Sequence, residues 1–373
     1  MSITFRVPFY FVHSPHDVGS FSRPPLQASF QPQSVMSRGP VILGIETSCD
    51  DTAAAIVSGG QLLSSTISSQ IEHEAYGGVV PELASRAHER LIVPVVESAI
   101  KDSGFAKTDI DGLAVTVGPG LIGSLLVGVS FCKALSVGLD VPLMGVNHLE
   151  GHLASLFLGR EGPPLPHLCL IVSGGHTQLM RIEGQGKIQL MGKTRDDAAG
   201  EAFDKVAKLL GLPYPGGPRV DELARKGDTA FHAFPRTRLK GFDYSFSGIK
   251  TSVLYYLNAL SVVDREMLIK EHLADICASF QEAVVDMLIA PVKKAMRDTG
   301  IYHVGLVGGV SANSRLRERM QALTDSFGGE LFVPSLEHCM DNAAMIAMAG
   351  YQQYQANEFS PLTITAEPGL VIK

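Results

Sequence analysis

The sequence predicts an α/β protein built from two similar halves that hold a nucleotide between them. Hydrophobic residues make up 45% of the 373 positions and there are 38 glycines, a composition typical of α/β proteins with many tight loops. Short apolar strands alternate with amphipathic helices. A pattern of strand, polar turn, strand, glycine turn and strand also occurs twice, about 127 residues apart.

The first half opens with the first copy of this meander. Strands are expected at 41–45, 53–57 and 61–69, with a turn at 58–60. The turn after the first strand contains Thr47, Ser48 and Asp50. Such turns can hold a phosphate through backbone N–H groups and hydroxyls, with an acid nearby, although an ordinary hairpin is the commoner meaning of the pattern.

Two β/α units follow the meander. Pro81 opens a helix that runs to about residue 102, and a buried strand at 113–117 leads into a helix at 121–137. Residues 112–132 carry no charge, but Gly118-Pro119-Gly120 interrupts them. Neither part reaches the roughly 20 helical residues that a bilayer requires, so no transmembrane helix is expected.

His148 and His152 come next, behind Asn147, a plausible helix cap. Side chains four residues apart lie on one helical face, so the two imidazoles can converge on one metal ion. Two ordinary histidines are an equally good explanation of this pattern. The zinc-peptidase motif H-E-x-x-H does not apply, because Glu150 lies about 200° around the helix from His148. A metal here needs a third ligand from elsewhere in the chain.

The second half repeats the meander, with strands at 168–172, 178–182 and 187–191 and a glycine-hydroxyl turn at 173–177. A helix follows to about residue 210, then a rigid turn at 215–218 and a helix from Asp221. The stretch 234–240 is basic and has aromatic residues beside it. Exposed, it suits RNA phosphates and bases; a solvated loop with packed rings is the alternative.

The last part supplies a nucleotide corner and a candidate third metal ligand. A long helix is expected at 270–297, followed by a strand at 304–307, the diglycine segment 308–313 and another helix. A strand, a diglycine and a helix N-terminus form an anion- or adenosine-binding corner. After a strand at 331–334, Asp341 stands at or near the cap of the C-terminal helix, where it can complete the metal site.

The net charge, the cysteines and residues 1–40 indicate which partners and which cellular compartment to expect. The net charge of −7 excludes a generally basic nucleic-acid-binding surface, so any nucleic acid must meet a local patch. Five cysteines without a C-x-x-C pair indicate a reducing compartment. Residues 1–40 hold six prolines and one acid; they are expected to be a disordered extension, with a transit peptide or an over-long start before Met36 as alternatives.

Taken in order, the motifs resemble one family, tRNA N6-adenosine threonylcarbamoyltransferase of the bacterial and mitochondrial TsaD type, formerly called O-sialoglycoprotein endopeptidase. Each motif is weak alone, but together they span nearly all of residues 41–350 and are specific. They are Gly44-Ile45-Glu46-Thr47-Ser48-Cys49-Asp50, Gly77-Gly78-Val79-Val80-Pro81-Glu82-Leu83-Ala84-Ser85-Arg86, Asn147-His148-Leu149-Glu150-Gly151-His152, Val172-Ser173-Gly174-Gly175-His176-Thr177, Gly308-Gly309-Val310-Ser311-Ala312-Asn313 and Asp341-Asn342-Ala343.

The resemblance implies the actin/Hsp70/sugar-kinase fold, with two duplicated RNase-H-like lobes and the ligand cleft between them. This agrees with the internal repeat. The expected N-terminal lobe comprises residues 41–146 plus about 346–373, and the C-terminal lobe comprises 147–345.

The resemblance also implies roles for individual residues. His148, His152 and Asp341 hold one divalent metal, with Fe²⁺ favoured and Zn²⁺ possible, and Asp50 is the candidate catalytic acid-base residue. The expected substrate-binding residues are Ile171, Val172, Ser173, Gly174, Gly175, Asp204, Gly217, Asp221 and Asn313. Archaeal and eukaryotic cytosolic relatives have a ligand tyrosine at the position of Ile171, which places this chain in the bacterial and mitochondrial branch. Asp51 stands where many bacterial members have glutamate, a mild departure.

The implied reaction transfers the threonylcarbamoyl group from threonylcarbamoyl-AMP to N6 of adenosine 37 in tRNAs that read codons beginning with A, and releases AMP. The expected partners are tRNA and, in bacteria, a paralogous TsaB-type subunit and a TsaE-type ATPase; a homodimer is expected if the protein is mitochondrial. No membrane partner is expected. The expected location is the cytoplasm, or the mitochondrion if residues 1–40 are a transit peptide.

Two further expectations concern the tRNA surface and the alternative function. The cations proposed to contact tRNA are Lys193, Arg195, Arg236, Arg238 and Lys240. The alternative function is an ATP-dependent kinase or ATPase of the same fold. Such proteins need no H-x-x-x-H pair, so a stoichiometric metal distinguishes the two functions.

Overall fold

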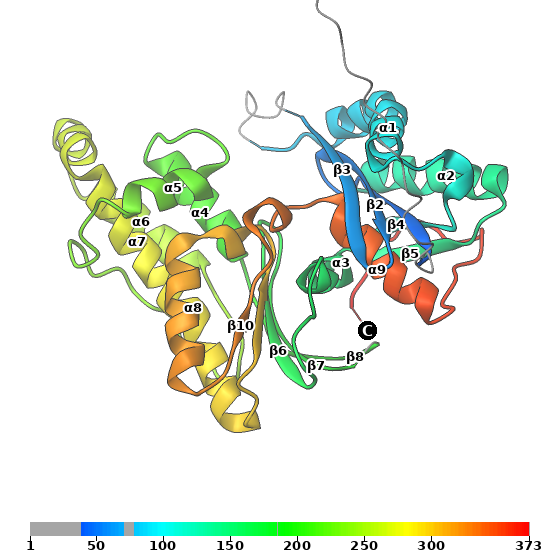
Figure 1. Ribbon diagram of the computed structural model, residues 1–373. Helices are drawn as coiled ribbons and strands as arrows, with labels where there is room; N and C mark the ends of the chain where they lie inside the picture. The colour runs from blue at the N-terminus through cyan, green and yellow to red at the C-terminus, as the bar shows by residue number, and fades with distance from the viewer. Residues whose placement is uncertain (1–38, 71–77, 185, 373) are drawn as a thin grey trace, which may run out of the picture. The chain divides into compact units, whose positions relative to one another are not determined.

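Two five-stranded sheets form the framework of this computed structural model, which describes residues 39–70, 78–184 and 186–372 (Figure 1). The predicted disordered extension, residues 1–40, lies outside the described residues except for its last two positions. Each sheet is mixed, with an antiparallel part and a parallel part.

The first sheet has the strand order β3-β2-β1-β4-β5. Its strands are β1 (Val41–Glu46), β2 (Asp51–Ser58), β3 (Gln61–Ser69), β4 (Gly112–Gly118) and β5 (Leu143–Asn147). The first three pair antiparallel, as the meander predicts, whereas β4 is parallel to both β1 and β5. Parallel neighbours need a crossover connection, and helices supply it here.

The second sheet repeats this order as β8-β7-β6-β9-β10. Its strands are β6 (His167–Val172), β7 (Thr177–Gly184), β8 (Lys187–Lys193), β9 (Val304–Val307) and β10 (Leu331–Phe332). The pairing directions also repeat, since β6, β7 and β8 are antiparallel neighbours and β9 is parallel to β6 and β10. The predicted duplication is therefore confirmed.

Helices cover both faces of the first sheet. Ile42 and Leu43 are neighbours in β1 and point to opposite faces, because side chains alternate along a strand. Leu43 lies in the core that contains residues of α1 (Pro81–Ser103) and α2 (Ile122–Leu139). Ile42 lies in the core that contains residues of α9 (Ala343–Gln355). The last helix of the chain thus packs on the first strand.

The approach of α9 to β1 is close because position 44 is a glycine. A Cβ atom there would lie 2.4 Å from the backbone nitrogen of Ala347 and 2.7 Å from the carbonyl oxygen of Ala343. Gly350 makes the reciprocal contact from the helix, where a Cβ would lie 2.3 Å from the Cβ of Ala114. The two glycines fix how near the helix sits to the sheet.

The short helix α3 (His148–Ala154) links the two sheets. Its Ala154 belongs to the core beside α9, whereas Leu149 and Leu153 pack with Ile171 of β6 and Val307 of β9. The helix begins where β5 ends, and the Asn147 side chain accepts a hydrogen bond from the backbone N–H of Leu149 at 2.9 Å. The predicted cap is therefore present.

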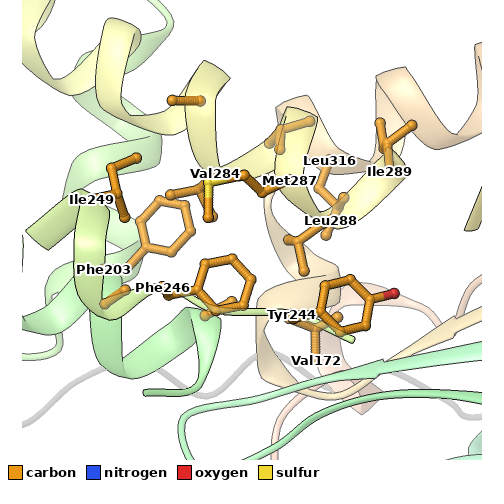
Figure 2. Packing of buried hydrophobic residues seen from close by; sticks show 14 of the residues in the cluster. Val172, Phe203, Tyr244, Phe246, Ile249, Val284, Met287, Leu288, Ile289 and Leu316 are labelled. Carbon is orange, nitrogen blue, oxygen red and sulfur yellow. The ribbon is translucent and has the colours of Figure 1, made fainter. Parts of the chain in front are cut away.

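The largest core lies on the other face of the second sheet. It is formed with α4 (Ala199–Leu209), α5 (Gly216–Ala224), α6 (Ser247–Asn258), α7 (Val262–Thr299) and α8 (Ser314–Ser326). Figure 2 shows rings from the segment before α6 and from α4 filling the space beneath α7. Residues of α5, α7 and α8 also line a cavity.

Two of the rings in this core answer a question left open by the sequence. Tyr244 and Phe246, close to the basic stretch 234–240, are 2% and 0% exposed and lie within the cluster in Figure 2. Rings buried in this way cannot stack on RNA bases. For these two aromatic residues, the alternative of rings packed in the protein core is therefore the right one.

Two predicted helix starts were too late. Helix α5 begins at Gly216, so the predicted diglycine turn is the first helical turn. The reason is a side-chain cap from outside the segment, since Asp204 Oδ1 accepts hydrogen bonds from the N–H groups of Gly216 and Gly217. Helix α7 begins at Val262, and His272 interrupts its helical geometry with φ −123° and ψ 22°.

Helix α2 is, among the described residues, the one helix long and apolar enough to cross a membrane. A third of its length is buried. Leu125, Val129 and Cys132 form its buried face, and the last two lie in the core beneath the first sheet. Packing on the sheet accounts for the apolar character of that face.

Candidate metal centre and nucleotide site

His148, His152 and Asp341 converge at one point. Asp341 Oδ1 lies 3.3 Å from His148 Nε2 and 3.2 Å from His152 Nε2. One ligand atom from each of the three residues lies within 4.8 Å of the other two. Both imidazoles are buried, whereas the Asp341 side chain is one-third exposed. The site therefore has protein on the histidine side and an opening on the carboxylate side.

Two features of this cluster suit a divalent cation. Neither ring nitrogen of His152 has a hydrogen-bond partner among the described residues, although the ring is 0% exposed. Its Nε2 is close to Asp341, but the ring is not oriented to donate a hydrogen bond to it. A buried polar nitrogen left unpaired is costly, and a metal ion would satisfy it. Two imidazoles and one carboxylate are also a common ligand set for Fe²⁺ and Zn²⁺.

The electrostatics of the cluster favour positive charge at the same point. Burial alone would lower the pKa of His148, but Asp341 and Glu46 outweigh it and raise that pKa well above its usual value. Burial likewise opposes ionisation of Asp341, yet the two histidines hold the pKa of its carboxyl well below its usual range. Two carboxylates beside two buried imidazoles attract a cation.

A fourth residue, Glu46, contacts the cluster and was not expected from the sequence. It ends β1, is 1% exposed, and its Oε2 accepts a hydrogen bond from His148 Nδ1 at 3.1 Å. Ser48 Oγ lies 3.2 Å from the same nitrogen. The only signal in the sequence is an acid directly after the apolar run 41–45. Burial raises and His148 lowers the pKa of Glu46, and the net result is a lowered pKa.

The turn at 173–177 reaches the same region from the second sheet. Ser173 N–H donates to the His176 carbonyl oxygen at 2.8 Å, and His176 N–H donates to Ser173 Oγ at 3.1 Å. Burial, followed by the nearby imidazoles of His148 and His152, lowers the pKa of His176 to about 4. The turn is therefore close enough to the two histidines to sense their charge.

The five residues expected to bind substrate along this turn differ in accessibility. Ile171 and Val172 are fully buried within β6, so only their backbone can reach a ligand. Gly174 and Gly175 are exposed, and a Cβ on either would meet nothing within 4 Å. Two adjacent open glycines leave backbone N–H groups free to approach an anion.

The predicted nucleotide residues make hydrogen bonds at the starts of α5 and α8. Asp204 caps α5 through Gly216 and Gly217. Asp221 is buried and accepts from the Ser314 hydroxyl at 2.7 Å, which joins α5 to α8. Asn313 caps α8 by accepting from the N–H of Leu316 at 2.9 Å.

A cavity of about 430 Å³ lies between the C-terminal end of α5, the middle of α7 and the start of α8. Gln281 lines it and accepts a hydrogen bond from the Asn313 amide at 2.7 Å. Ser314, the partner of Asp221, lines it as well. The cavity is a candidate site for a nucleoside, and the open turn at Gly174 and Gly175 is a candidate site for a phosphate.

Comparison with known proteins decides the family. The profile of tRNA N6-adenosine threonylcarbamoyltransferase (TsaD) matches residues 61–348. The chain belongs to this family. A relative of that name from Salinibacter ruber is 58% identical over 331 residues, which cover 88% of this chain and 99% of the relative. One from Cytophaga hutchinsonii is 48% identical over 339 residues, which cover 91% and 98%.

Comparison with solved structures gives the fold class of this threonylcarbamoyltransferase. HypF from T. kodakarensis aligns with a TM-score of 0.61 at 13% identity, over 87% of this chain and 49% of HypF. Full-length HypF in a phosphate- and nucleotide-bound form aligns with a TM-score of 0.55 at 16% identity, over 86% and 47%. The likeness concerns the fold alone. Together with the duplicated sheets, it confirms the actin/Hsp70/sugar-kinase fold.

The first turn of this transferase holds two carboxylates between β1 and β2. Asp50 is half-buried and lies two residues from Ser48, which contacts His148. Asp51 begins β2, and burial, with smaller effects from Asp50 and Asp341, raises its pKa to about 6. Both acids thus lie in the turn that contacts the converging histidines, and from the sequence Asp51 was only a mild departure from the family pattern.

The cations proposed for tRNA binding are not equally free. Arg195 is paired with Asp243 at 2.6 Å, and Arg236 with Asp286 at 3.0 Å. Lys193, Arg238 and Lys240 are exposed, and no ion pair to them is found among the described residues. Three of the five candidates therefore keep their charge available to a partner.

Proposed function

We propose that this protein transfers the threonylcarbamoyl group from threonylcarbamoyl-AMP to N6 of adenosine 37 in tRNAs that read codons beginning with A, with release of AMP. Membership of the transferase family supports the class of reaction. The observation that carries the proposal for this chain is the convergence of His148, His152 and Asp341 near the open turn of Gly174 and Gly175.

The three converging residues are proposed to hold one divalent ion, Fe²⁺ in preference and Zn²⁺ as the alternative. When bound, such an ion supplies a Lewis acid to the carbonyl group of the acyl-adenylate. Two imidazoles and one carboxylate leave coordination positions open for substrate oxygens. The one-third exposure of Asp341 puts the open side toward solvent.

The AMP part of the donor is proposed to lie along the second sheet. Backbone N–H groups of Gly174 and Gly175, in a turn that Ser173 closes through its bonds to His176, stabilise the negative charge that develops on the phosphate and carbonyl oxygens. The nucleoside is proposed to enter the cavity lined by Gln281 and Ser314. Ile171 and Val172 support the turn from within the strand.

Asp204, Gly217, Asp221 and Asn313 are proposed to hold ribose and adenine. Their hydrogen bonds fix the starts of α5 and α8, and the start of α8 lines the cavity. A ligand that meets two helix N-termini finds oriented N–H groups there. The same positions at the helix starts thus serve both the observed capping and the proposed binding of the nucleoside.

Asp50 is proposed to accept the proton that leaves the attacking amine. General-base catalysis of this kind contributes about 10²- to 10⁴-fold to a rate. Asp50 lies two residues after Ser48, and the Ser48 hydroxyl contacts His148 of the cluster. Asp51 is the second acid in the same turn and is the natural comparison in any test.

The proposal extends to partners and location. tRNA is proposed to bind the patch formed by Lys193, Arg238 and Lys240, with Arg195 and Arg236 joining if their ion pairs open. The protein is proposed to work in the bacterial cytoplasm with a paralogous subunit and a small ATPase, or as a homodimer if it is mitochondrial. The lobes are proposed to comprise 41–146 with 346–373, and 147–345.

The deciding experiment combines the purified protein, threonylcarbamoyl-AMP and unmodified tRNA that reads codons beginning with A. Incorporation of labelled threonine at adenosine 37, together with release of AMP, is expected. A tRNA with another base at that position is the control and should take up no label. No incorporation, even after the paralogous subunit and the ATPase are added, would sink the proposal.

A further inference from the structure

Glu46 is a buried carboxylate that touches the metal cluster without belonging to it. Its Oε1 accepts a hydrogen bond from the Ser48 backbone N–H at 2.5 Å. Its Oε2 accepts from the Thr116 hydroxyl at 2.6 Å and from His148 Nδ1 at 3.1 Å. Both oxygens of the side chain are thus held, Oε1 by the backbone just after β1 and Oε2 by Thr116 of β4.

The hydrogen bonds of Glu46 require an acceptor at the end that faces Ser48. A backbone N–H can only donate, so the atom facing Ser48 has to accept. The atom facing His148 meets a ring nitrogen that can donate or accept, depending on which nitrogen carries the proton. An ionised carboxylate accepts at both ends, and it therefore selects the form of His148 with its proton on Nδ1.

We propose that Glu46 is a positioning residue that, in the metal-bound protein, fixes His148 with its proton on Nδ1 and leaves the lone pair of Nε2 for the metal. The inference rests on the proposed metal site. A carboxylate that orients a ligand histidine in this way also raises the basicity of the coordinating nitrogen. Glu46 acts through His148 and has no contact with substrate.

Ser48 cannot replace Glu46 in this role. Its hydroxyl also lies near His148 Nδ1, at 3.2 Å, but a hydroxyl both donates and accepts and so selects neither form of the ring. His152 has no orienting partner among the described residues for either nitrogen. Orientation of the ligand set by hydrogen bonding is therefore concentrated on one histidine.

The exchange Glu46→Gln tests the proposal with almost no change in volume. If the amide oxygen faces Ser48, the amide N–H₂ faces His148 Nδ1 and pushes its proton to Nε2, the nitrogen that should bind metal. If the amide is turned round, two donors face each other at Ser48. Either arrangement disfavours metal binding, and second contacts of this kind are worth about 10- to 100-fold in metal affinity.

Metal affinity is measured on chelator-stripped full-length protein by titration with Zn²⁺ against a competing indicator. Co²⁺ absorption bands report the ligand geometry separately. Glu46→Gln should bind Zn²⁺ about 10- to 100-fold more weakly than the wild type. Glu150→Gln is the matched control, because it makes the same chemical change on α3 at a residue outside the cluster, and it should bind as the wild type does.

The outcomes separate this inference from the proposed function. A wild-type protein that binds no metal would overturn the metal site itself. Wild-type affinity in a folded Glu46→Gln protein would overturn the role of Glu46 and leave the site intact. If the variant does not fold, ¹⁵N spectra of the zinc-loaded wild type decide, since a His148 ring with its proton on Nε2 contradicts the proposal.

Discussion

At the residue scale, Asp50 and Asp51 are adjacent acids whose surroundings differ. Asp50→Asn is expected to lower the transfer rate by about 10²- to 10⁴-fold, because the amide cannot accept the amine proton. Metal content should not change, because Asp50 is not one of the three converging residues. The measurements are single-turnover transfer to tRNA and metal per subunit.

Asp51→Asn is the comparison for that prediction. The pKa of Asp51 is raised to about 6 by burial, so as a base it would lose activity as the pH falls through 6. A large rate loss in Asp51→Asn, with wild-type rates in Asp50→Asn, would move the role of base to Asp51.

Asp341→Ala is expected to abolish stoichiometric metal binding. Two imidazoles remain, and protein sites for these metals usually supply three or four ligands. Elemental analysis of the purified variant measures this directly. Asp325→Ala, an exposed aspartate on α8, is the control and should retain its metal. Unchanged metal in Asp341→Ala would show that the proposed ligand set is wrong.

The metal ligands could be proposed from the sequence, but Glu46 could not. His148 and His152 follow from helical spacing, and Asp341 followed from its place near a helix start together with the family resemblance. The contact of Glu46 with His148 depends on two strand ends, β1 and β5, that lie at the same edge of the sheet with β4 between them. The spacing of residues along the chain does not show which strand ends lie side by side.

At the element scale, the seat of α9 on β1 controls where Asp341 lies. Gly44→Ala puts a Cβ within 2.4 Å of the backbone of Ala347, and backbone cannot rotate away. We expect a loss of about 1–3 kcal/mol in unfolding free energy, as for overpacked cores. Weaker metal binding should accompany it, because Asp341 directly precedes the cap of α9. Urea unfolding and zinc titration are the measurements.

Gly138→Ala is the matched control for that substitution. Gly138 lies in α2, and a Cβ there meets nothing within 4 Å. Alanine is favoured over glycine inside a helix by about 1 kcal/mol, so this variant should be no less stable than the wild type. Equal stability of Gly44→Ala and Gly138→Ala would contradict the close approach.

Elements with a strong local pattern were predicted well, and those with partners far along the chain were not. The strands at β3 and β9 match the predicted ranges because their apolar runs end in clear turn residues. The early start of α5 depends on Asp204, a cap twelve residues before Gly216. A capping side chain that far from the helix leaves no signal in the local sequence.

At the scale of the whole molecule, His167 makes stability depend on pH. Burial lowers the pKa of His167 to about 4, and its Nδ1 lies 3.2 Å from the Pro164 carbonyl oxygen. In the unfolded chain the pKa is about 6.5. Between those values the unfolded state binds the proton and the folded state does not, so stability falls as the pH drops from 6.5 toward 4.

The predicted size of that effect is about 2 kcal/mol between pH 7.5 and pH 5. Urea unfolding of metal-free protein at the two pH values measures it. His167→Gln should lose less stability on acidification than the wild type by about that amount. Other groups, including His148, titrate alike in both proteins and cancel in the comparison. Parallel losses in the two proteins would contradict the assignment.

Binding of tRNA should depend steeply on salt, although the net charge of the chain is −7. Contacts to phosphate release counterions, so the logarithm of the affinity falls linearly with the logarithm of salt concentration. Lys193→Ala and Lys240→Ala should each reduce that slope by about 1. Filter binding across a salt series measures it, with Lys293→Ala on α7 as the control; equal slopes in all variants would place tRNA elsewhere.

The duplication was predictable because it is written twice in the sequence, as a meander with a polar turn. The exact lobe limits at 146 and 346 stay a prediction. What the repeat could not show is that α3 packs against both the second sheet and α9. The two apolar faces of α3 can be recognised only in the folded structure, where each packs against its own partner.

The seat of α9 on Gly44 also sets an order for biosynthesis. The ribosome releases the first strand about 300 residues before the helix that covers it, or about 15 to 60 seconds at bacterial rates of synthesis. The second sheet and its helices, from His167 to Phe332, are complete before α9 emerges. A chain that stalls in this interval carries a finished second sheet and a first sheet with one bare apolar face. Such nascent chains are expected to need a chaperone until the final helix arrives.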